Sequence, residues 1–366
     1  MRVLVVGGGI GGLALGVALA RRGIAFEIIE RRAHYGDEGA GIVLGGNVMS
    51  AMERLGLADA IRAVGNPVGQ AIIADAHGRK LQETPFRVEG FPPAIAVHRT
   101  LLLKTLRGAL PAPVRLDTPF ENGAARGFDL VVGADGIRST VRRVVCGTDM
   151  EPRFAGYTCW RFVVDGHFSA DAWELWGRGR RFGVVPIGHG RTYCFLTENA
   201  ARRAPDPWKD LAQFKERFAE FASPARDALA AVGSLDPLLH NDIEDCLAPR
   251  WSRPAHGEEP AMVLIGDAAH AVTPNLGQGA GLAIEDGVAL AELLSAGPIG
   301  DAVAKFEQLR RPRAEWIWKQ SWLFGRAGQL ESGILRSVRD TLVAHTPERI
   351  TRASMERIVD MPGVPT

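Results

Sequence analysis

The sequence predicts an α/β fold in which a Rossmann-like domain of the glutathione-reductase type carries an inserted antiparallel sheet and is followed by C-terminal helices. One observation is a strand, glycine turn, helix and strand within residues 1–30, and another is a series of short strands separated by glycine turns after residue 154. The length of 366 residues exceeds the roughly 250–300 at which single hydrophobic cores stop growing. We therefore expect more than one structural unit.

The N-terminal unit begins with a short apolar run. Residues 3–6 are rich in β-branched side chains, which is typical of a buried parallel strand. Gly7, Gly9 and Gly12 follow in the pattern G-x-G-x-x-G. In this pattern the glycines permit a tight turn, the close approach of a pyrophosphate, and packing of the next helix on the strand.

A helix over residues 10–22 and a strand over residues 25–29 then lead to Glu30. An acid about 20 residues after the glycines binds the ribose hydroxyls of an adenosine and disfavours a 2′-phosphate. The unit therefore predicts a site for FAD or NAD rather than NADP, and it leaves open which of the two binds. An ordinary βαβ unit with an accidental glycine cluster is the weaker interpretation.

Composition narrows the class of protein. The formal net charge of +1 gives no electrostatic reason to expect nucleic acid or an anionic membrane as partner. An apolar content of 46% is ordinary for a globular protein, and no apolar run approaches the ~20 residues of a membrane span. No signal peptide is recognisable, and the four cysteines have neither C-x-x-C pairing nor metal-like spacing. We expect a cytoplasmic protein with reduced thiols and no metal site.

Two further stretches place polar groups after short apolar strands. Residues 128–142 read FDLVVGADGIRSTVR, and residues 261–286 read AMVLIGDAAHAVTPNLGQGAGLAIED. Asp267 follows a strand, where its carboxylate can accept hydrogen bonds from ribitol or ribose hydroxyls. A helix that begins near residues 279–281 offers free N–H groups and partial positive charge to an anionic ligand. Each stretch taken singly is also compatible with a structural loop.

Together with GGGIGG at residues 7–12, the motifs GADGIRSTVR and GDAAHAVTPNLGQGAGLAIED resemble the three fingerprints of the single-component, FAD-dependent class A flavoprotein monooxygenases. This family includes the p-hydroxybenzoate, salicylate and urate hydroxylases, and the resemblance covers most of the chain. It implies a discontinuous FAD-binding domain, a substrate domain and a C-terminal helical region. The FAD-binding domain is expected to comprise residues 1–68, 94–153 and 255–298. The substrate domain would comprise residues 69–93 and 154–254, and the C-terminal helical region residues 299–366.

The resemblance also implies a set of FAD-binding residues. Arg99 would begin a helix and reach the ribityl or phosphate portion, Arg31 would line the adenine, and Asp135 would help to close the pyrophosphate site. A helix N-terminus would face the pyrimidine edge of the flavin, where the reduced ring carries negative charge. The full set comprises Gly7, Gly9, Ile10, Gly11, Gly12, Glu30, Arg31, Gly41, Val43, Arg99, Asp135, Gly266, Asp267, Pro274, Gly277, Gly279 and Ala280.

The resemblance places the substrate under the inserted sheet. Arg181 and Tyr193 lie in GRRFGVVPIGHGRTY, which is similar to a urate hydroxylase segment that bears an arginine and a tyrosine at the same spacing. Such an arginine would pair with an anionic or carbonyl-rich substrate, and the tyrosine would hydrogen-bond to it. Enzymes of other specificity have similar segments, so urate is one candidate among several.

The implied reaction uses non-covalent FAD, with NADH or NADPH as a transient co-substrate, because the chain holds no second dinucleotide fingerprint. O₂ would form a flavin C4a-hydroperoxide that hydroxylates or epoxidises a small electron-rich aromatic or heterocyclic ring, in a monomer or a homodimer. The alternatives are a simple NAD dehydrogenase, a halogenase-like oxidoreductase and a redox-responsive FAD-binding module. A halogenase usually carries W-x-W-x-I-P, and residues 316–318 lack the Ile-Pro.

Overall fold

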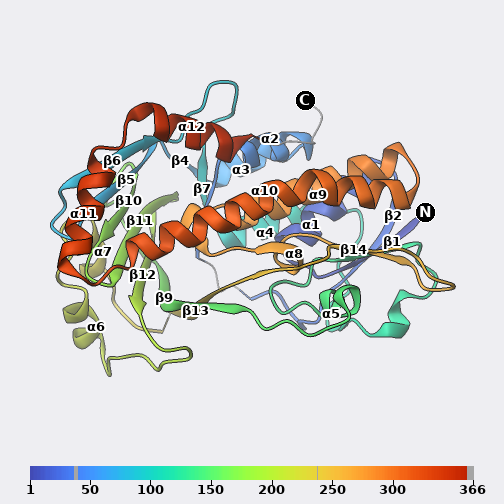
Figure 1. Cartoon of the computed structure of the whole chain (residues 1–366), viewed down its shortest axis with the longest axis horizontal. Coiled ribbons are helices and arrows are strands. Elements are labelled where there is room, and N and C mark those ends of the chain that lie inside the picture. The colour runs from blue at the N-terminus through green and yellow to red at the C-terminus, as the bar shows by residue number, and fades with distance from the viewer. Residues whose placement is uncertain (37–39, 237, 361–366) are drawn as a thin grey trace.

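A computed structural model describes residues 1–36, 40–236 and 238–360 (Figure 1). A five-stranded sheet in the order β14-β15-β8-β1-β2 forms one half of the molecule, and all its pairings are parallel except that of the edge strand β14. Its four parallel strands are the apolar runs that the sequence predicts to be buried. The strands are β1 (Arg2–Val6), β2 (Ala25–Ile29), β8 (Leu130–Gly133), β14 (Ser252–Arg253) and β15 (Ala261–Leu264).

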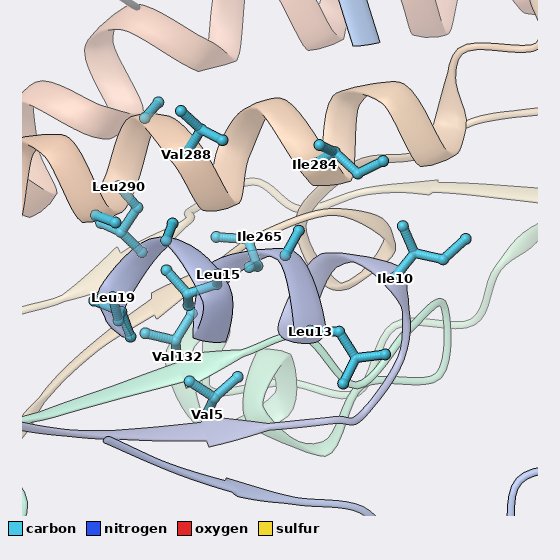
Figure 2. Packing of buried hydrophobic residues seen from close by; sticks show 14 of the residues in the cluster. Val5, Ile10, Leu13, Leu15, Leu19, Val132, Ile265, Ile284, Val288 and Leu290 are labelled. Carbon is cyan, nitrogen blue, oxygen red and sulfur yellow. The ribbon is translucent and has the colours of Figure 1, made fainter. Parts of the chain in front are cut away.

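Helix α1 (Ile10–Arg21) lies between this sheet and α9 (Gly279–Ala296). Figure 2 shows Leu15 and Leu19 of α1 among Val5, Val132 and Leu290, all fully buried. The two helices approach closely because α9 has glycine at the contact: a Cβ at Gly287 would lie 2.7 Å from the Leu15 nitrogen. The three sequence motifs are thereby held against one hydrophobic core.

A second, seven-stranded sheet has the order β13-β9-β12-β11-β10-β5-β6, and its pairings are antiparallel except that of β10 with β5. Alternate side chains point to opposite faces of each strand. One face, with Trp160 and Phe182, packs on α6 (Leu211–Arg217) and α7 (Ala225–Ala230). The strands are β5 (Gln70–Asp75), β6 (Lys80–Pro85), β9 (Arg153–Asp165), β10 (Ala172–Trp176), β11 (Arg180–Gly188), β12 (Arg191–Asn199) and β13 (Leu239–Leu247).

A three-stranded sheet, β3-β7-β4, lies between the two halves with the remaining N-terminal helices. The sequence suggests a helical stretch over residues 47–64 with Gly56 as an interruption. The chain forms two helices there, α2 and α3, because Gly56 adopts a φ of 71° that no helix continues through. The elements are β3 (Gly41–Leu44), α2 (Gly46–Arg54), α3 (Ala58–Val64), β4 (Asn66–Pro67), β7 (Ile95–His98), α4 (Arg99–Gly108), η1 (Asn122–Ala125), α5 (Thr140–Cys146), α8 (Asp267–His270) and η2 (Pro274–Leu276).

Three helices end the described chain: α10 (Ile299–Gly328), α11 (Gly333–Ala344) and α12 (Glu348–Val359). In Figure 1, α10 runs across both halves of the molecule and the chain then returns through α11 and α12 toward α2. None of the helices in the part of the chain that the structure describes combines the length and hydropathy needed to cross a membrane. The division into domains remains a prediction. One strand, β14, falls within the residues predicted for the substrate domain but pairs with β15 of the five-stranded sheet.

Candidate active site

A cavity of about 830 Å³ lies between the parallel sheet and the seven-stranded sheet. Its floor comes from the first turn of α1, from β3 and from the loop that follows β15. Its roof is the second face of the seven-stranded sheet, and α10 and α12 form one wall. Of the predicted cofactor residues, those on the cavity surface are Ile10, Gly11, Gly41, Val43, Arg99, Gly266, Asp267, Pro274, Gly277, Gly279 and Ala280.

The glycine turn has the geometry that a dinucleotide requires. Gly7 has a φ of 115°, and a Cβ there would lie 2.3 Å from the Ala134 oxygen, so the turn depends on glycine. A Cβ at Gly9 would meet nothing within 4 Å, which leaves open space for a pyrophosphate. The Glu30 carboxylate accepts hydrogen bonds from the backbone nitrogens of Gly8 at 2.8 Å and Arg32 at 3.0 Å. Arg31 is exposed and does not line the cavity.

Arg99 and Asp267 bring opposite charges to the middle of the cavity. Arg99 opens α4, and burial together with repulsion from Arg32 and Arg161 lowers its pKa. Asp267 follows β15 and its side chain is open to the cavity interior. The surrounding protein raises the pKa of this carboxyl group, and the nearby His270 and Arg99 counteract the rise. Hydroxyl groups of a ribityl chain would satisfy both side chains.

Asp135 does not line the cavity, although the adjacent Ala134 and Gly136 do. Its carboxylate accepts hydrogen bonds from Ser139 Oγ and from the backbone nitrogen of Thr140 at 2.7 Å, so it caps α5. The same motif supplies Arg142, which is buried and donates to the Ala268 carbonyl at 3.1 Å. The second motif thus braces the third, a role for Arg142 that sequence reasoning missed.

The third motif presents a helix N-terminus to the cavity. Gly277 adopts a φ of 63° and turns the chain into α9, and no side chain caps the amide groups of the first turn. These amides are available to an anionic group. Behind them, Asn47 Nδ2 donates to Gln278 Oε1 at 3.1 Å and to Glu285 Oε1 at 2.5 Å, which fixes the start of the helix.

These features fit FAD. An open glycine cradle adjoins the acid at the end of β2, hydroxyl partners occupy the middle of the cavity, and uncapped amides lie beyond them. The order matches the adenosine, pyrophosphate, ribityl and pyrimidine parts of the cofactor. No part of this arrangement requires a covalent link to the chain.

The two predicted substrate residues lie on the roof in different environments. Arg181 is 2% exposed and donates to Glu174 at 2.9 Å, to Asn275 at 2.8 Å and to Gln329 at 3.1 Å. Its guanidinium therefore holds the loop before α9 in place. Tyr193 faces the cavity beside Gly41, and burial raises the pKa of its phenol, which remains neutral.

Sequence reasoning missed two parts of the site. Arg161 of β9 points to the cavity from the same face as Tyr193, a position that the alternation of the strand would have indicated. Helix α12 closes the wall with two columns of side chains at the i, i+4 and i+8 spacing of an amphipathic helix. They are Ile350, Thr351, Ser354, Met355, Ile358 and Val359.

Comparisons with known proteins agree with this geometry. The FAD binding domain family model matches residues 1–112 and 127–320. The chain is 36% identical to an aurachin C monooxygenase/isomerase from Stigmatella aurantiaca over 94% of each protein, and 33% identical to a 2-heptyl-3-hydroxy-4(1H)-quinolone synthase from Pseudomonas aeruginosa over 98% of this chain and 97% of that one. The HpxO protein of Klebsiella pneumoniae, crystallised with FAD and uric acid, superposes with a TM-score of 0.80 at 25% identity, over 98% of this chain and 96% of HpxO.

A family match over most of the chain, relatives of this similarity and a cavity built for the cofactor all lead to the same assignment. The electron donor of such enzymes is NAD(P)H, and O₂ is the second substrate. The chain therefore belongs to the FAD binding domain family and is an FAD-dependent monooxygenase of the aromatic hydroxylase type.

Proposed function

We propose that this monooxygenase hydroxylates the ring of a quinolone-like heterocycle that carries an apolar side chain. The observation that carries the proposal is the apolar wall beside the flavin site, contributed by α10 and α12. A relative at 33% identity is named as the synthase of a quinolone with a heptyl group. A hydrocarbon chain of that kind would remove its surface from water against this wall.

The wall is held in place at several points. Leu323 and Phe324 of α10 and Ile350 and Met355 of α12 all line the cavity. Gln82 Nε2 of β6 donates to Thr351 Oγ1 at 2.8 Å and so ties α12 to the roof.

At the other end of α12, Arg313 donates to the carbonyl of Ile358 at 2.8 Å. Arg313 is itself buried and pairs with Glu285 of α9. Arg313 therefore connects α12, which would contact the side chain of the substrate, to α9, whose first turn would face the flavin.

The protein's part in the reaction is to bind, orient and exclude water. FAD, when bound, accepts two electrons from NAD(P)H and activates O₂, so that one oxygen atom enters the ring and the other leaves as water. Glu30, Arg99 and Asp267 would hold the cofactor, and the amides at the start of α9 would stabilise negative charge on its pyrimidine edge. The apolar wall would keep solvent from the reacting atoms.

Urate is the second candidate. The arginine–tyrosine spacing of 181 and 193 and the likeness to HpxO favour it. Three side-chain partners already occupy the Arg181 guanidinium, however, and a purine has no group that would use the apolar wall. We therefore rank the alkylated ring first and assign Arg181 to positioning of the Asn275 loop.

The test is consumption of NADH and NADPH by the FAD-loaded protein under oxygen-18-labelled O₂, with 2-heptyl-4(1H)-quinolone and with urate. We expect the quinolone to stimulate consumption and to gain one labelled oxygen. The proposal fails if the quinolone yields only hydrogen peroxide, or if urate alone is hydroxylated.

A further inference from the structure

Arg161 lines the cavity from the roof, on the strand next to the edge strand β13. It lies on β9 opposite Phe195 of β12, and its side chain shares the cavity face with Cys159 and Tyr193. The alternate residues, Trp160 and Phe162, point the other way into the core of the substrate half. Arg161 is also close enough to Arg99 that repulsion between the two cations lowers the pKa of Arg99. The guanidinium therefore faces the same cavity as Arg99 and Asp267.

This arginine lacks an acidic partner. Within residues 1–36, 40–236 and 238–360, no carboxylate forms a salt bridge with Arg161, and its buried Nε has no hydrogen-bond partner. The groups that interact with it are Cys159 and Tyr193, and burial raises the pKa of both, so that both are neutral. Removing a cation from water without a counter-charge is unfavourable.

The fully buried arginines have protein acceptors: Arg142 donates to backbone carbonyl groups, and the others pair with carboxylates. Arg181 binds Glu174, Arg310 binds Glu285 and Asp286, and Arg313 binds Glu285. Arg161 is thus distinguished by position and by its missing partner, and it opens onto the cavity. A ligand is the remaining source of the complementary oxygen.

We propose that Arg161 recognises an oxygen substituent of the substrate ring, a carbonyl or the oxyanion derived from it, with Tyr193 as the neighbouring hydrogen-bond donor. This inference rests on the proposed function only in that the ligand is a ring substrate. A reduced flavin would also carry negative charge, and the uncapped amides at the start of α9 would stabilise it. Arg161 would then select for ring oxygen, while the α10–α12 wall selects for the side chain.

The binding test compares two ligands on the oxidised, FAD-loaded protein by the change in flavin absorbance. One is 2-heptyl-4(1H)-quinolone, and the other is 2-heptylquinoline, which lacks the ring oxygen. We expect Arg161→Gln to weaken binding of the quinolone by about 10- to 100-fold and binding of the quinoline by less than about 3-fold. The quinolone affinity of Arg161→Lys should lie between those of Arg161→Gln and the wild type. Arg178 is exposed, so the matched control Arg178→Gln should bind both ligands as the wild type does.

Equal loss for both ligands would assign Arg161 a structural role and overturn the inference. An unchanged quinolone affinity with an altered flavin reduction potential would assign it to the cofactor, and this outcome also overturns it. Failure of the wild type to bind the quinolone counts against the proposed function alone. The same comparison then uses 4-methylphenol and toluene, which differ by one ring oxygen and carry no other oxygen.

A second measurement needs no ligand. Because Arg161 carries a partly buried charge without a carboxylate partner, Arg161→Met in the FAD-loaded protein should melt at or above the wild-type temperature. Arg310→Met breaks a buried pair and should melt lower by more than about 5 °C. A comparable loss in Arg161→Met would contradict the assignment, because a residue kept for a substrate should not stabilise the FAD-loaded protein in the absence of that substrate.

Discussion

The ring of Phe195 lies against Gly183, its cross-strand partner: a Cβ at Gly183 would be 1.8 Å from Phe195 Cε1. The glycine leaves the space in which this ring lies along the sheet and lines the cavity. The shape of the roof at this point therefore depends on the absence of one methyl group.

Gly183→Ala should displace the Phe195 ring. We expect a loss of about 1–3 kcal/mol in the free energy of unfolding, because a methyl group has no room at this contact. Weaker ligand binding and a larger share of hydrogen peroxide should accompany it. Urea denaturation and a peroxide assay measure both, with Gly233→Ala as control, since a Cβ at the exposed Gly233 would meet nothing within 4 Å. An alanine variant with wild-type stability would contradict the contact.

Glu30→Ala should release FAD. The carboxylate is the acid at the end of β2 and fixes the Gly8 amide, so its loss removes charge-assisted hydrogen bonds around the adenosine. We expect the dissociation constant of FAD to rise by about 10- to 100-fold, measured by recovery of flavin fluorescence on release. Glu27→Gln on the same strand, which pairs with Arg2 and Arg115 at the surface, is the control and should retain FAD.

The sequence predicts most of the cofactor site because local rules govern it. A glycine turn, an acid at a strand end and a glycine-rich helix start each have their own spacing, and parallel strands bring their carboxyl ends to one edge. Gly9 lies in the turn after β1, Glu30 directly follows β2 and Asp267 follows β15, and of the three Asp267 lines the cavity. The FAD contacts themselves remain predictions, and Asp135 shows why, since its carboxylate caps α5 instead of facing the cavity.

The substrate side is less predictable because its residues meet through tertiary packing. Arg181 and Arg161 both face the cavity from the roof, and the contacts of Arg181 with Glu174, Asn275 and Gln329 distinguish the paired arginine from the unpaired one. That packing requires Gly328, where a Cβ would lie 2.6 Å from Arg181 Cδ. No spacing in the sequence encodes such a contact, and the return of α12 to the cavity is equally non-local.

Arg313→Met should loosen α12. Arg313 pairs with the buried Glu285 and donates to the Ile358 carbonyl, so its loss removes both the pair and the anchor of the helix. We expect about 3 kcal/mol of destabilisation and faster amide hydrogen exchange over residues 348–359. Arg311→Met removes only partly exposed pairs with Glu307 and Glu315 and should cost less than about 1 kcal/mol. Unchanged exchange in Arg313→Met would show that α12 is held by other contacts.

Acid stability should depend on Asp286. Burial alone would raise the pKa of Asp286, but His270 and Arg310 hold it well below the ordinary value. A lowered folded-state pKa stabilises the protein above the unfolded value of about 3.9, and the contribution is lost as the pH falls through the folded value.

Asp286→Asn lacks this contribution at every pH. It should be about 3 kcal/mol less stable near neutrality and should lose less stability than the wild type below about pH 4. Melting temperatures measured across that range test this, with the exposed Asp301→Asn as control. Parallel curves for Asp286→Asn and the wild type would disprove the role.

A series of 2-alkyl-4(1H)-quinolones, from methyl to heptyl, tests the central claim most directly. The claim is that one cavity holds FAD at its glycine-rich floor and an alkylated ring against α10 and α12. Each buried methylene contributes up to ~0.8 kcal/mol, so the dissociation constant should fall by about 100-fold or more from methyl to heptyl. Met355→Trp, which should fill the space beside α12, should abolish most of this increase in affinity with chain length. Equal affinities along the series in the wild type would contradict the account.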